Sequence, residues 1–165
     1  MTALLSPLLI LHVLAAIFWV GTTLFMVLFL EPTVAALGAD GGKFMQKLIG
    51  GTRLSPALAV TALLTVLTGL AMYGPVTGNS MAVMFGDRLP LTSGAVAGIL
   101  SAITGGAMNG RASARMQALG KEIAAKKGPP APAQLAEMQK LQATLRQGSR
   151  ITAILMVIAV VGMTW

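Results

Sequence analysis

His12 is the residue best suited to chemistry in this chain, because it is the only histidine and lies inside a long apolar run. That run extends from Ala3 to Leu30 without a charged residue. An ionisable side chain within a membrane segment indicates a functional site by default. An imidazole there could bind a metal or haem iron, relay protons, or hydrogen-bond to a carbonyl or a threonine. All three interpretations stay open, although the apolar runs contain no Asp or Glu to partner a proton relay.

Methionine is the second unusual residue type, with 11 copies in 165 residues. A thioether is a soft ligand that selects Cu(I), and together with imidazole it suits copper or haem iron. Met156 is predicted to reach the same depth as His12 and is a candidate second cofactor ligand. Candidate metal ligands nearer the outer face are Met72, Met81, Met84 and Met163. Methionine also fills gaps in apolar cores, so packing is the alternative role for each.

The composition limits the class of protein more firmly than it limits the chemistry. The chain is 55% hydrophobic and only 10% charged, which is typical of a single integral membrane domain over residues 1–165. Cysteine is absent, so disulfides, thiolate metal sites and cysteine nucleophiles are excluded. The net charge of +7 does not indicate nucleic acid, because the basic residues lie between apolar runs and no nucleic-acid motif accompanies them.

Four apolar runs are each predicted to cross a lipid bilayer as a helix, which makes the fold an all-α transmembrane four-helix bundle. The predicted spans are about 4–30, 54–73, 91–109 and 149–165. We expect the first span to end at Glu31-Pro32 and the second at Gly74-Pro75, because proline lacks the amide hydrogen that continues a helix.

The connections between spans predict an orientation and some further helix. Helical spacing continues on both sides of Gly128–Pro132, so the third and fourth spans extend as Leu91–Lys127 and Ala133–Trp165 into a hairpin over about 110–148. Lys43–Ile49 is predicted to form a short amphipathic helix at the membrane surface. The third connection carries eight of the twelve basic residues and the first carries three. The positive-inside rule therefore places both connections in the cytoplasm and both termini outside a bacterial inner membrane.

Each span carries a stripe of small, hydroxyl or methionine residues at alternating four- and three-residue steps, which places the stripe on one helix face. The stripes are His12, Ala16, Trp19, Thr23 and Met26; Thr61, Thr65, Thr68 and Met72; Gly94, Gly98, Ser101, Gly105 and Met108; and Ser149, Thr152, Met156, Ala159 and Met163. Small residues let helix backbones approach closely in a membrane, so these faces are predicted to form the bundle interior. The glycines could equally mediate a homodimer.

The segment Leu11-His-Val-Leu-Ala-Ala-Ile-Phe-Trp-Val-Gly21 resembles the first-helix signature of CopD-type copper-resistance membrane proteins and their small relatives. Phe29-Leu-Glu-Pro32, Thr68-Gly-Leu-Ala-Met-Tyr73 and the Gly-Pro-Pro-containing hairpin resemble those relatives too. More distantly, His12 with Trp19 seven positions later is similar to the HemJ-type protoporphyrinogen oxidases, a family associated with haem b. This likeness implies cofactor contacts for His12 and Trp19. The membrane-embedded lysine of that family has no counterpart in the spans here.

Two functional hypotheses follow. The first is a CopD-like membrane protein that binds haem b or copper through His12, in electron transfer or copper handling. The second is a non-catalytic accessory subunit that assembles with a larger membrane complex. No nucleophile–base pair, carboxylate pair or phosphate-binding loop is present, so we do not expect an autonomous enzyme. With one histidine, a haem with two histidine ligands would need His12 from two chains.

Overall fold

The computed structural model describes residues 2–126 and 129–164, and these residues form helices and no strand. In chain order the helical segments are α1 (Thr2–Phe25), η1 (Met26–Leu30), α2 (Glu31–Ala36), α3 (Gly38–Gly51), α4 (Leu54–Thr77), α5 (Met81–Phe85), α6 (Leu89–Thr104), η2 (Gly105–Gly110), α7 (Arg111–Ala125) and α8 (Pro132–Met163).

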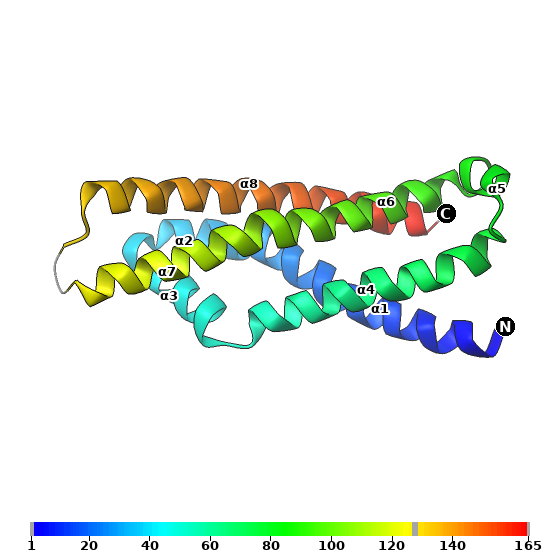
Figure 1. The fold of residues 1–165 in the computed structure, drawn as a ribbon, viewed down its shortest axis with the longest axis horizontal. Helices are drawn as coiled ribbons and strands as arrows, with labels where there is room; N and C mark the ends of the chain where they lie inside the picture. The colour runs from blue at the N-terminus through cyan, green and yellow to red at the C-terminus, as the bar shows by residue number, and fades with distance from the viewer. Residues whose placement is uncertain (1, 127–128, 165) are drawn as a thin grey trace.

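These segments join into four long rods, which confirms the predicted all-α bundle with four helices able to cross a membrane. One rod is α1–η1–α2, another is α6–η2–α7, and α4 and α8 are the other two (Figure 1). All four contain a stretch that is long and apolar enough to span a bilayer. The start of α1, the end of α8 and the short α5 lie at one end of the molecule (Figure 1). The facing ends of α7 and α8 lie at the other.

The helices of the first two spans continue past the prolines at which they were expected to end. The two segments η1 and η2 are π-helical, and η1 stands directly before Glu31-Pro32. Its wider turn makes room for the proline ring, so the rod continues to Ala36. The second span runs through Pro75 to Thr77, since membrane helices tolerate proline where neighbouring groups satisfy the freed backbone. It ends at Gly78, whose φ of 62° is left-handed, and the Asn79 amide donates back to the Gly74 carbonyl at 3.1 Å.

The helical hairpin and the short basic helix are both present. α7 packs antiparallel to α8 beyond the apolar part of the bundle (Figure 1). Leu119 of α7 is buried. Lys127, Gly128 and Trp165, which belong to the predicted hairpin turn and helix ends, lie outside the described residues. The predicted helix at Lys43–Ile49 is confirmed as part of the longer α3.

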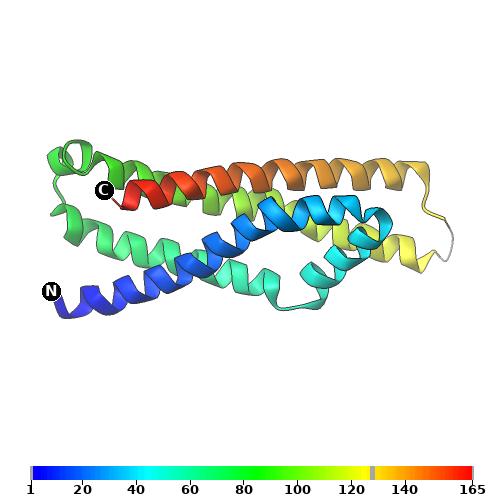
Figure 2. The same ribbon diagram turned by 180° about the vertical axis from the view of Figure 1, so that it is seen from behind.

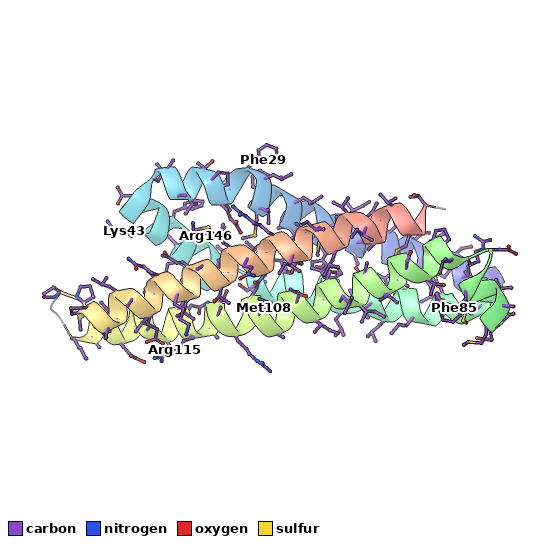
Figure 3. The ribbon with its side chains drawn as sticks, turned by 90° about the horizontal axis from the view of Figure 1, so that it is seen from above. Phe29, Lys43, Phe85, Met108, Arg115 and Arg146 are labelled. Carbon is purple, nitrogen blue, oxygen red and sulfur yellow. The ribbon has the colours of Figure 1, made fainter. Side chains whose placement is uncertain are left out.

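The bundle has small and hydroxyl residues inside and large apolar residues outside, as expected for a protein whose solvent is lipid. Buried positions of the predicted stripes are Trp19, Thr65, Thr68, Gly94, Ser101, Thr152, Met156 and Ala159. In α1 the buried alanine is Ala15 rather than the predicted Ala16. Exposed positions include Ile17, Phe18, Leu63, Leu67, Leu100, Ile103, Ile154 and Val161. Figure 3 shows Phe29 pointing away from the bundle at the far side of its rod.

The two most extensive pairings are α6 with α8 and α1 with α4. α6 and α8 approach most closely where Gly94 faces Gly162, because a Cβ built on Gly162 would lie 2.8 Å from Gly94 Cα. α1 crosses α4 near its middle and then runs toward α8 through α2 (Figure 2). At the start of α2, half-buried Glu31 lies close to Ser149 and Arg150 of α8. The crossing of α1 and α4 therefore brings His12 against α4.

Truncating Leu119 tests the packing of the hairpin. Leu119 is 1% exposed, so Leu119→Ala should lower the free energy of unfolding by about 2–5 kcal/mol, through lost contacts and the cavity left behind. Leu135 of α8 is 48% exposed and gives the matched control, for which Leu135→Ala should change that energy by less than about 1 kcal/mol. Denaturant titration of the detergent-solubilised protein measures both. Equal effects would show that Leu119 is not buried in the folded protein.

Candidate functional site

His12 is held by a hydrogen bond to the backbone of α4. Its Nδ1 lies 2.9 Å from the Thr65 carbonyl oxygen and 3.1 Å from Thr68 Oγ1. A carbonyl oxygen can only accept, so Nδ1 carries a hydrogen and donates it. In the neutral imidazole that tautomer leaves the lone pair on Nε2. Nε2 makes no hydrogen bond to any part of the chain that the structure describes. The nitrogen that could bind a metal is therefore the unengaged one.

The Thr68 hydroxyl supports this arrangement. It donates to the Leu64 carbonyl at 2.6 Å, which leaves an oxygen lone pair for the His12 Nδ1–H. Thr65 likewise donates its hydroxyl back to the Thr61 carbonyl at 2.8 Å. These bonds satisfy the buried hydroxyl donors within α4 itself, as threonines often do in helices. The imidazole thus meets only acceptors on its Nδ1 side.

Gly69 makes room for the imidazole ring. A Cβ built on Gly69 would lie 3.0 Å from His12 Cε1 and 3.4 Å from His12 Nδ1. Carbon atoms in contact normally stand about 3.5–4.0 Å apart, so any side chain here would push the ring outward. The sequence Thr65-x-x-Thr68-Gly69 therefore forms the binding surface for the ring, which we call the seat. Thr65 supplies a carbonyl acceptor, Thr68 a hydroxyl acceptor and Gly69 the space for the ring.

The ring lies at an apolar cavity of about 180 Å³ between α1, α4, α6 and the end of α8. Its lining residues are His12, Trp19, Thr65, Val66, Gly69, Leu70, Tyr73, Thr92, Ala95, Val96, Gly98, Ile99 and Met163. None of these described residues carries a carboxylate or a basic amine. The cavity is therefore a low-dielectric space in which imidazole nitrogen and thioether sulfur are the soft donors.

Tyr73 and Thr92 join α4 to α6 along this cavity. Thr92 Oγ1 donates to the Met84 carbonyl at 2.7 Å, and the Tyr73 hydroxyl, 2.7 Å from Thr92 Oγ1, therefore donates to it. This chain connects the start of α6 to α5.

The predicted site residues separate into two groups. Trp19, 7% exposed, and Met163 line the cavity together with His12. Met156 does not line it and is buried at 1% exposure on α8. Met72 is half-buried on α4, while α5 carries exposed Met81 and half-buried Met84; none of these three lines the cavity. Of the predicted thioethers, Met163 is the one that shares the cavity with His12.

Most residues of the cavity were not identified from the sequence as site residues, among them Gly69, Tyr73 and Thr92. The signal for Gly69 was available, because it directly follows Thr68 on the predicted inward face of its span. The pairing of Tyr73 with Thr92 had no comparable signal, since it depends on how far α6 is shifted along α4.

The cavity is small within one chain. Its volume of about 180 Å³ lies below the roughly 300 Å³ at which pockets for drug-sized organic ligands start, and haem is a large member of that size class. A single copper ion meets no such limit, and the imidazole and thioether lining this cavity are ligands of the kind that Cu(I) prefers. Among the described residues no cluster of three or more His, Cys, Asp or Glu side chains could hold a harder metal.

Fold and cavity together define a helical bundle with four membrane-crossing candidates and a single histidine at the cavity between them. Comparison of the chain with protein families, with curated proteins and with solved structures finds no match. The resemblance to CopD-like proteins stays a prediction from the residues quoted above.

Proposed function

We propose that the protein is a CopD-like integral membrane protein that binds copper as Cu(I) through His12, in copper handling or electron transfer. The observation that carries this proposal is the orientation of the imidazole by the Thr65 carbonyl. Metal-binding histidines almost always donate their other ring N–H to a carbonyl, a carboxylate or water, which fixes the tautomer and raises ligand basicity. His12 has this arrangement, with a carbonyl 2.9 Å from Nδ1.

Met163 is the proposed second ligand. Its thioether belongs to the same cavity as His12, and Cu(I) accepts a small number of soft ligands. When bound, copper would supply a one-electron redox centre or a cargo ion. The chain's own contribution is to orient Nε2 through α4, to exclude water with Trp19 and the aliphatic lining, and to hold the thioether at the end of α8.

The orientation and location complete the proposal. Basic residues concentrate in α3, α7 and the first half of α8, at the end of the molecule opposite α5 (Figure 1). The positive-inside rule favours a bacterial inner membrane with this end in the cytoplasm and both termini extracytoplasmic. His12 would then lie in the outer half of the bilayer, within reach of copper from outside the cell.

Competition for Cu(I) tests the proposal. The protein is purified in detergent without oxygen, and Cu(I) is distributed between it and a chromophoric chelator. We expect about one Cu(I) per chain for the natural sequence and loss of this site in His12→Ala. Met163→Leu should reduce the affinity by at least about 10-fold, since losing a ligand should cost no less than losing a group that orients one. Met81→Leu is the matched control, because Met81 does not line the cavity, and it should leave the affinity unchanged.

Two results would contradict the proposal. Equal Cu(I) uptake by His12→Ala would place the metal elsewhere. A metal-free, colourless protein that co-purifies with a partner would favour the accessory-subunit hypothesis. A Soret absorption band lost in His12→Ala would instead show haem bound through His12.

A further inference from the structure

A second cavity lies between α3 and α7, away from His12. Its volume is about 330 Å³. The residues that line it are Lys43, Gln46, Lys47, Gly50, Gly51, Gln117 and Lys121. Three of the seven are lysines, two are amides and two are glycines, so the lining offers hydrogen-bond donors and positive charge without an acidic side chain.

Glycines and amides shape the floor of this groove, which we call the lysine groove. A Cβ built on Gly50 of α3 would lie 3.6 Å from Gln117 Cδ of α7. In the reverse direction, a Cβ on Gly120 of α7 would lie 3.1 Å from Gln46 Nε2 of α3. Each amide therefore packs over a glycine of the opposite helix. This reciprocal contact brings the lysines of both helices to one groove.

The positive charge of the groove is largely uncompensated. Lys43 pairs with Asp40 at 2.9 Å, but the two side chains are 78% and 81% exposed, so water screens this pair. Lys47 and Lys121 form no ion pair with any residue that the structure describes. Like charges brought into one groove repel one another, and an anion placed among them removes that cost. The groove is therefore suited to a multiply charged, oxygen-rich anion.

The position of the groove identifies the source of that anion. α3 ends at Gly51, three residues before the membrane-crossing candidate α4 begins at Leu54. Lys43 and Lys47 are four residues apart on α3, and Phe44 and Leu48 repeat that spacing beside them. Phe44 is 49% exposed. A helix with lysines and an exposed aromatic residue side by side is typical of a membrane surface, where acidic phospholipid headgroups are concentrated.

We propose that the lysine groove binds the phosphate headgroup of an acidic phospholipid, in the leaflet next to α3, with Lys47 and Lys121 as its main charge contacts. Lysine is a common phosphate ligand that acts as a point charge, and the glutamine amides add neutral donors. The acyl chains would extend along the exposed apolar surface at the start of α4. Lys43 lies in the first half of α3, at the edge of the molecule (Figure 3), and lines the same groove.

Titration with defined lipids tests this site. The full chain in a neutral detergent is mixed with increasing phosphatidylglycerol, phosphatidylcholine or inorganic phosphate, and the thermal-unfolding midpoint reports binding. We expect phosphatidylglycerol to raise the midpoint and phosphatidylcholine to leave it unchanged. The double substitution Lys47→Gln with Lys121→Gln should weaken the phosphatidylglycerol dependence by about 30-fold, since each lysine near an acidic surface contributes roughly a factor of five.

The control has the same loss of charge outside the groove. Lys126→Gln with Lys140→Gln replaces two exposed lysines that do not line it, and binding should stay within about twofold of the natural sequence. The pair Lys47→Arg with Lys121→Arg keeps the charge and should keep binding, which separates a binding effect from a folding defect. Equal weakening by the control pair would overturn the groove in favour of general surface charge. An equal stabilisation by inorganic phosphate would overturn the lipid as its ligand.

Discussion

Replacing Gly162 by alanine should lower the free energy of unfolding by about 3 kcal/mol, because the added methyl group has no room between α6 and α8. Its Cβ would lie 2.6 Å from the Pro90 carbonyl oxygen and 2.8 Å from Gly94 Cα. Both are backbone atoms, so the clash is relieved only by separating the two helices. Overpacking of this kind typically costs about 1–3 kcal/mol, and a backbone clash lies at the upper end. Denaturant titration in detergent measures the change.

A glycine on the lipid-facing side gives a control with the opposite sign. Gly21 of α1 has no neighbouring atom within 4 Å of its would-be Cβ. Gly21→Ala should therefore stabilise the protein by up to about 1 kcal/mol through helix propensity alone.

The glycine that faces Gly162 gives a second test. In Gly94→Ala the new Cβ would lie 2.9 Å from the Ala159 carbonyl oxygen. Since either change already separates the helices, the double variant should be less destabilised than the sum. Additive effects would contradict the close approach of α6 and α8.

Replacing Gly69 by alanine should disturb the imidazole without unfolding the bundle. The new Cβ, 3.0 Å from His12 Cε1, would push the ring away from the Thr65 carbonyl and lengthen the hydrogen bond to Nδ1. If His12 binds Cu(I), its affinity should fall by about 10- to 100-fold, as for other losses of the groups that orient a ligand. The side chain of His12 is not deeply buried, so the ring can move and the stability should change little.

The ring orientation can be measured without a metal. Because His12 is the only histidine, the protein labelled with ¹⁵N-histidine gives one pair of ring nitrogen signals. These should report the Nδ1–H tautomer in the natural sequence and in Gly21→Ala, and a mixture of tautomers in Gly69→Ala. An unchanged spectrum in Gly69→Ala would show that Gly69 does not seat the ring. Changed ring signals with unchanged Cu(I) affinity would support the role of Gly69 in positioning the His12 ring. They would contradict the role of His12 as a Cu(I) ligand.

Sequence alone determined the class of the protein and most of its helices. Four long apolar runs predicted four membrane-crossing helices, because a bilayer leaves the backbone few other structures. The spacing on both sides of Gly128–Pro132 predicted the hairpin. Stripes of small and hydroxyl residues predicted the buried faces, since helical periodicity fixes which side chains share a face. Pro32 and Pro75 were expected to end their helices and do not. A π turn accommodates the first proline, and a membrane helix tolerates the second.

The tertiary structure decided how the helices are matched along their lengths. Periodicity assigns residues to a face but says nothing of the axial shift and crossing angle between two faces, which packing sets. That shift places His12 at Thr65 and Gly69, and it brings Met163 rather than Met156 to its cavity. The backbone carbonyl that orients His12 has no sequence signal, because every residue has one. The lysine groove likewise arises only when α3 folds back on α7, two helices separated in the chain by the whole of α4 to η2.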